Sequence, residues 1–134
     1  MQASLREARL QPESIDYICA HGTGTRANDK AEVAAVRRLF QKRVVPMSSI
    51  KALTGHSLGA ASALEAVACV MSLQHQILPP TANYRDPDVE CEWDVVPNKP
   101  RPATLGVVIN NAYAFGGNNA SLILRHPDLI EWSA

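Results

Sequence analysis

Short apolar runs recur along the chain and predict a small β-sheet. Each run is shorter than an ordinary helix and is bounded by polar residues, glycine or proline, a pattern typical of strands. The four predicted strands cover residues 15–20, 44–48, 105–110 and 121–124. Residues 111–119 lie between the last two and are predicted to form a turn. We therefore expect a mixed sheet of about four strands.

Helical spacing of apolar positions fills much of the remaining chain, which places the protein in the α/β class. The predicted helices cover residues 3–10, residues 28–42 and residues 57–75. Asn28 or Asp29 can cap the middle helix, and Glu32 lies in its first turn. The proline-rich residues 79–103 predict an extended surface connection.

The predicted helix over residues 57–75 is rich in alanine and apolar around its whole circumference. Such a helix is normally buried on all sides. A sheet of about four strands can cover only one side of it, so the sequence predicts a missing layer, supplied by another chain or by another part of the same protein. Glu65 carries a charge within this helix. A buried carboxylate needs a partner, and Lys51 is the natural candidate.

Composition narrows the class of protein to one globular domain. Hydrophobic residues make up 46% of the 134-residue chain, which suits a packed core. Thirteen basic and thirteen acidic residues cancel, and no basic stripe follows a helix, so we expect no nucleic-acid partner. No stretch is long and apolar enough to predict a membrane span. Cys19, Cys69 and Cys91 lie far apart without metal-ligand spacing, which predicts reduced thiols in a cytoplasmic protein and no metal site.

Two histidines, each in a glycine-containing turn, are the strongest chemical signal in the sequence. His21 opens the turn HGTGT after a predicted strand, and His56 closes the segment KALTGH before the long helix. Such positions are where α/β folds place active-site groups. A later segment, FGGNN at residues 115–119, offers backbone N–H groups. Two imidazoles and such donors can polarise a carbonyl and hold the enolate or oxyanion that follows.

Two other motifs suggest different chemistry. Residues 55–59, GHSLG, match the G-x-S-x-G nucleophile elbow of α/β-hydrolases, with Ser57 as the nucleophile. That elbow needs a strand running directly into its first glycine, whereas residues 49–54 read as a polar loop. Residues 22–27, GTGTRA, match a weak form of the dinucleotide fingerprint, but no acidic residue follows at the required spacing. The hydrolase remains an alternative.

Four motifs occur in a fixed order: AHGTGT at residues 20–25, NDKAE at 28–32, SIKALTGH at 49–56 and NAYAFGGNN at 111–119. Together they closely resemble the C-terminal half of β-ketoacyl-acyl carrier protein synthases, the ketosynthases of fatty acid and polyketide synthesis. The resemblance covers roughly residues 5–126 and implies a thiolase-like fold. It further implies that residues 1–134 are an incomplete ketosynthase C-terminal domain, and that the N-terminal half with the nucleophilic cysteine is absent.

The resemblance also implies roles for individual residues. His21 and His56 would hydrogen-bond the malonyl thioester carbonyl and stabilise the enolate formed on decarboxylation. Lys51 would organise the site, with Glu65 as its ion-pair partner. Phe115 would act as a gate whose backbone N–H completes the oxyanion hole.

The remaining implied roles are in support and binding. Gly116 and Gly117 would allow the tight turn beside the gate, and Thr23 and Thr25 would contact the phosphopantetheine arm of the substrate. Family members often have glycine directly before the gating phenylalanine, where this chain has Ala114. A Cβ there limits backbone freedom, so we expect a more restricted gate.

The implied reaction is the decarboxylative Claisen condensation of malonyl-acyl carrier protein with an acyl thioester. This is the acyltransferase activity of a 3-oxoacyl-acyl carrier protein synthase, and it needs no metal or organic cofactor. The expected partners are an acyl carrier protein, the missing half and a second copy in a homodimer. No cysteine of this chain suits the nucleophile, so we expect the isolated chain to be inactive. A non-catalytic ketosynthase-like partner subunit is the alternative, and pathway and acyl chain length stay open.

Overall fold

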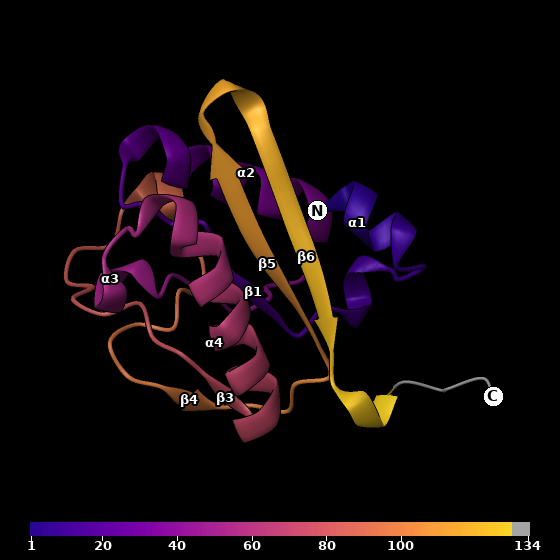
Figure 1. The fold of residues 1–134 in the computed structure, drawn as a ribbon. Helices are drawn as coiled ribbons and strands as arrows, with labels where there is room; N and C mark the ends of the chain where they lie inside the picture. The colour runs from indigo at the N-terminus through magenta and orange to yellow at the C-terminus, as the bar shows by residue number, and fades with distance from the viewer. Residues whose placement is uncertain (130–134) are drawn as a thin grey trace.

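The computed structural model describes residues 1–129 and contains the expected mixed four-stranded sheet, in the order β2-β1-β5-β6 (Figure 1). Strand β1 pairs in parallel with both of its neighbours, β2 and β5, whereas β6 runs antiparallel to β5. These strands are β1 (Tyr17–Cys19), β2 (Met47–Ser48), β5 (Val107–Ala114) and β6 (Asn118–Arg125). A separate antiparallel pair joins β3 (Ile77–Leu78) to β4 (Arg101–Pro102).

Helices cover both faces of the sheet, because side chains alternate between its faces along each strand. On one face, Ile18 belongs to a core that includes residues of α1 (Gln2–Glu7) and α2 (Arg26–Phe40). On the other, Tyr17 and Cys19 pack in a second core with residues of α4 (Ala61–His75). A short helix, α3 (Lys51–Thr54), follows β2. The ends of β1 and β2 therefore deliver their following turns to one edge of the sheet.

The predicted turn over residues 111–119 is wrong. β5 continues to Ala114, and β6 begins at Asn118, which pairs directly with it. The true turn is only Phe115–Gly117, where Gly116 and Gly117 have φ of 77° and 79°. The ladder extends through residues of low strand propensity because each finds a cross-strand partner, which outweighs intrinsic preference.

Several other boundaries also differ from prediction. α2 begins at Arg26, without a side-chain cap from Asn28 or Asp29, and it ends where Gln41 takes a φ of 53°. α4 begins at Ala61, because Leu58 takes a φ of 50° and interrupts the helical pattern. Residues expected in loops form α3, β4 and a short 3-10 helix at Val89–Cys91, and the first turn expected in the long helix is instead a separate 3-10 helix at Leu58–Ala60.

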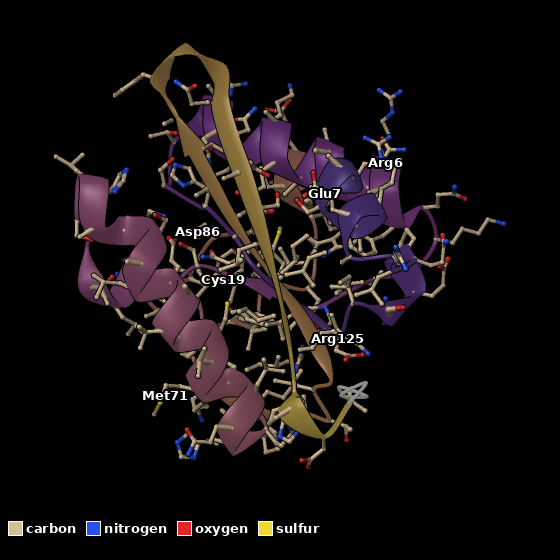
Figure 2. The ribbon with its side chains drawn as sticks, turned by 45° about the vertical axis from the view of Figure 1, so that its right-hand side comes forward. Arg6, Glu7, Cys19, Met71, Asp86 and Arg125 are labelled. Carbon is tan, nitrogen blue, oxygen red and sulfur yellow. The ribbon has the colours of Figure 1, made fainter. Side chains whose placement is uncertain are left out.

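The long helix is buried on one side only in this chain, as the sequence predicted. Its sheet-facing side is buried, as Glu65 and Cys69 show. Its outward side is apolar and exposed, and Met71 points away from the sheet (Figure 2). The exposed fractions are 44% for Leu64, 60% for Val67, 50% for Val70 and 47% for Met71. The sheet covers only one side of α4, as expected, and the outward side carries an uncovered apolar stripe. Within residues 1–129, no helix has the length and hydropathy that a membrane span requires.

Candidate active site

The turn after β1 is held by a buried carboxylate. Glu32, on α2, accepts the backbone N–H groups of His21 and Gly22, each at 3.0 Å, and the side-chain amide of Asn111 at 3.2 Å. Gly22 has a φ of 38°, and a Cβ there would lie 2.5 Å from Cβ of Ser49. Only glycine fits this close approach. Burial raises the pKa of Glu32, and the hydrogen bonds from Gly22 and His21 oppose that rise.

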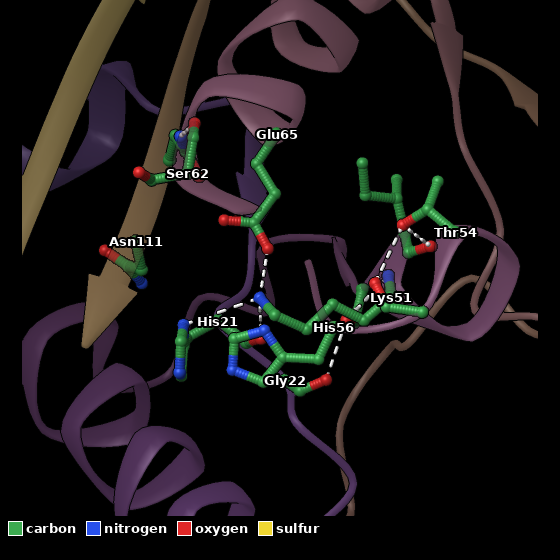
Figure 3. A network of polar contacts seen from close by, with 12 residues as sticks. His21, Gly22, Lys51, Thr54, His56, Ser62, Glu65 and Asn111 are labelled. Carbon is green, nitrogen blue, oxygen red and sulfur yellow. Dashed lines mark hydrogen bonds and ion pairs between the residues drawn. The ribbon is translucent and has the colours of Figure 1, made fainter. Parts of the chain in front are cut away.

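Lys51 of α3 connects its own helix to the turn after β1 and to α4, behind the histidines (Figure 3). Its Nζ donates to the backbone oxygen of His21 at 2.6 Å and lies 3.4 Å from His21 Nδ1. It also forms an ion pair with Glu65 of α4, as the sequence predicted. Both side chains are buried, with 6% of Lys51 and 1% of Glu65 exposed. Burial raises the pKa of Glu65, and Lys51 opposes that rise. Without Lys51, burial would favour the protonated, uncharged carboxyl group of Glu65.

His56 is oriented by a single backbone contact. The N–H of Leu58 donates to His56 Nδ1 at 3.2 Å. Leu58 has the left-handed φ of 50°, which is unfavourable for a bulky side chain. A nitrogen that accepts this bond carries no proton in the neutral ring, so the proton is on Nε2. The ring therefore presents an N–H donor on its other side.

His21 presents the same tautomer. An ammonium group can only donate, so Lys51 makes His21 Nδ1 an acceptor and leaves the proton on Nε2. Burial lowers the pKa of His21, and the charges of Lys51 and His56 lower it further, whereas Asp29 opposes them. The neutral form is therefore favoured at neutral pH. The two rings lie edge to face, with centroids 5.7 Å apart.

The two imidazoles open onto one pocket of about 760 Å³. Predicted residues that line it are His21, His56, Thr23, Thr25 and Phe115. The hydroxyls of the two threonines lie 2.9 Å apart, and the Phe115 side chain is fully exposed at the turn. The structure thus brings together the two histidines, the two threonines and Phe115, the predicted gate residue, with Lys51 and Glu65 directly behind them. Two imidazole N–H donors that line one pocket are suited to bind an acceptor oxygen there.

Tyr113 is a neighbour of the site that sequence reasoning missed. Its ring centroid lies 5.4 Å from that of His21, and it lines the same pocket. Burial raises the pKa of Tyr113, and the charge of nearby Glu32 adds to the rise, so its hydroxyl stays protonated. The signal that could have revealed Tyr113 is the alternation of side chains along β5, which puts Asn111 and Tyr113 on the same face of the strand.

The nucleophile elbow of a hydrolase is not formed at Ser57. Gly55 follows the helix α3 instead of a strand. Ser57 itself has a φ of −79°, without the strained backbone that the elbow imposes. The structure therefore overturns the hydrolase alternative.

Comparison with known proteins agrees with this arrangement. The family described as beta-ketoacyl synthase, C-terminal domain, matches residues 1–85. Nodulation protein E of Rhizobium leguminosarum bv. trifolii is 51% identical over 127 residues, covering 93% of this chain and 31% of that protein. The ketoacyl synthase alpha subunit of the tetracenomycin polyketide synthase of Streptomyces glaucescens is 45% identical over 127 residues, covering 93% and 30%.

A solved structure of a type II polyketide synthase acyl carrier protein in complex with its ketosynthase superposes with a TM-score of 0.90 and 32% identity. That alignment covers 92% of this chain and 31% of the other. This chain spans 30–31% of the length of these three proteins. The four-stranded sheet, the paired histidines and these matches show that the chain belongs to the β-ketoacyl synthase family and carries its C-terminal domain.

Proposed function

We propose that this chain supplies the decarboxylating half of a ketosynthase active site. The whole protein would condense malonyl-acyl carrier protein with an acyl thioester and release carbon dioxide. The observation that carries the proposal is the shared pocket, into which His21 and His56 present N–H donors while both Nδ1 atoms accept hydrogen bonds from the protein. Donors fixed in this way are suited to a single oxygen that gains negative charge.

In this mechanism the malonyl thioester oxygen lies between the two Nε2–H groups. As the bond to the leaving carboxylate breaks, its electron pair forms the enolate, and the oxygen gains the charge. The imidazoles donate to that oxygen without themselves losing a proton. Lys51 holds His21 through two contacts and keeps its Nδ1 an acceptor. The enolate carbon then attacks the acyl thioester and expels its sulfur.

The acyl group needs a nucleophile that this chain does not offer in reactive form. Cys19 and Cys69 are buried, and Cys91 is partly exposed. The pKa of Cys19 is raised above all by its hydrogen bond to Cys69 and by burial, and burial also raises the pKa of Cys91. Reactive cysteines have lowered pKa values and accessible sulfur atoms. We therefore assign residues 1–134 as a C-terminal ketosynthase domain whose nucleophile comes from the rest of the protein.

Carrier-protein binding follows from the same pocket. Thr23 and Thr25 line it with two hydroxyls, which can bind the amides of a phosphopantetheine arm. The Phe115 turn lies on the same pocket, so its movement would control entry. An acyl carrier protein is accordingly the proposed partner, and a homodimer the proposed state of the whole protein.

The proposal predicts different activities for the whole protein and for residues 1–134 alone. The whole protein should take up a radiolabelled acyl group covalently and release carbon dioxide from malonyl-carrier protein. The isolated chain should do neither, because it lacks the nucleophile. Covalent acylation of the isolated chain would contradict the assignment. A whole protein that binds the carrier but neither loads nor decarboxylates would instead be a partner subunit.

A second prediction concerns the exposed side of α4. We propose that the missing half covers this side, because Val67 and Met71 are exposed and apolar. Residues 1–134 alone should therefore self-associate, and Val67→Asp should return them to the monomer in sedimentation velocity. Gln74→Glu, a charge placed on an already polar exposed position of the helix, is the control and should leave association unchanged. A compact monomeric parent chain would contradict this prediction.

A further inference from the structure

Tyr113 is placed between the gate turn and the first histidine. It lies near the end of β5, two positions before Phe115. Its side chain is partly buried, and its ring is tilted by 56° against the ring of His21. An aromatic ring in this position excludes water from one side of the imidazole and limits its rotation.

Tyr113 also lies near Glu32, because the charge of that carboxylate adds to the effect of burial in raising the pKa of the Tyr113 hydroxyl. Glu32 is the carboxylate that accepts the N–H groups of His21 and Gly22. Asn111, two positions earlier on the same strand, donates to the same carboxylate. One face of β5 therefore contacts both the support of the His21 turn and the His21 ring itself.

We infer that Tyr113 is a positioning residue for His21: its ring packs against the imidazole, and the strand that carries it also binds, through Asn111, the carboxylate that holds the backbone of the same histidine. The inference rests on the proposed function, because it concerns how a decarboxylating histidine is kept neutral and aimed. It extends that function by linking the strand that leads into the Phe115 turn to the orientation of His21.

The ring and the hydroxyl should have separable effects on pH dependence. The groups that face His21 are Lys51, His56, Asp29, Glu32 and Tyr113. Burial is the largest cause of the lowered pKa of His21, and the Tyr113 ring contributes to that burial. Losing the ring lets water reach the imidazole, which raises its pKa. His21 then becomes protonated, and its Nδ1 ceases to accept from Lys51, at a higher pH than before.

The test compares Tyr113→Ala with Tyr113→Phe in the whole protein. Tyr113→Ala should lower kcat for malonyl-carrier decarboxylation about 10–100-fold at neutral pH. It should also move the acid limb of the pH profile up by about 0.5–1 unit. Tyr113→Phe keeps the ring, so it should leave the acid limb in place and recover most of kcat. Val107→Ala, a buried change at the start of the same strand, should lower stability and activity equally at every pH. Equal loss at every pH for Tyr113→Ala would overturn the inference and make Tyr113 merely structural.

A second readout separates this inference from the proposed function. The His21 imidazole can be titrated by NMR in histidine-labelled protein, with its signal assigned by comparison with His21→Gln. Its pKa should rise in Tyr113→Ala and stay unchanged in Tyr113→Phe. That titration needs no turnover, so a wild-type protein without decarboxylase activity would overturn the function while the titration still tests the placement. An unchanged His21 pKa in Tyr113→Ala would overturn the inference alone.

Discussion

Replacing His56 by alanine in the whole protein should lower the rate of malonyl-carrier decarboxylation about 10²–10³-fold, which corresponds to about 2.7–4 kcal/mol of lost transition-state stabilisation. The same loss is expected for His21→Ala. Each imidazole presents an Nε2–H donor to the shared pocket, and each has its Nδ1 occupied by the protein. Release of labelled carbon dioxide measures the effect.

His75→Ala is the matched control for these two substitutions. His75 is an exposed histidine at the C-terminal end of α4 and does not line the pocket of the other two. It should keep wild-type activity. His56→Gln retains an N–H donor and should lose less than His56→Ala. A loss below threefold for both His21→Ala and His56→Ala would show that charge at the thioester oxygen is stabilised by other groups.

Replacing Lys51 by methionine should lower the free energy of unfolding by about 3–5 kcal/mol, because it leaves the buried carboxylate of Glu65 without its cation. The substitution also removes two contacts to His21, so decarboxylation should fall with it. Denaturant titration of the whole protein and the labelled carbon dioxide assay measure the two effects.

A double substitution tests the cause of that loss. Lys51→Met combined with Glu65→Leu removes both charges and should regain most of the stability, but not the activity. The pair formed by Arg101 and Asp94 is the control, because its side chains are 44% and 28% exposed. Arg101→Met should cost about 0–1 kcal/mol, as exposed ion pairs do. Equal costs for Lys51→Met and Arg101→Met would contradict the burial argument.

Hydrophobic patterning was sufficient to predict the class of fold and the general position of each strand of the sheet. It failed where tertiary pairing overrides local preference. Asn111 and Asn118 indicate a turn by residue type, yet both lie in strands, because β5 and β6 pair along their whole length. It also failed at the start of α4, since the left-handed conformation of Leu58 has no signature in a leucine.

The motifs predicted the residues of the candidate site more accurately than hydrophobic patterning predicted the bounds of the helices and strands. Glycine-containing turns at strand ends led to His21 and His56, and the ion pair between Lys51 and Glu65 is present as predicted. The tautomers could not be predicted, because they depend on single contacts from Leu58 and Lys51. Tyr113 was missed for a related reason: its closeness to His21 depends on β5 continuing through residues that had been predicted as a turn.

The hydrogen bonds that orient the two imidazoles all arise inside this one polypeptide segment. Leu58 contacts the His56 ring, Lys51 contacts the His21 ring, and Glu32 holds the His21 backbone, and each of these contacts is made without a cysteine from another segment. In the proposed mechanism the two groups that stabilise the enolate are therefore held in place within this chain, and the cysteine sulfur is added when the other half of the protein binds. When the two halves of the protein are made separately and then mixed, only the cysteine loses orientational entropy on assembly, because the two imidazoles are already held in place.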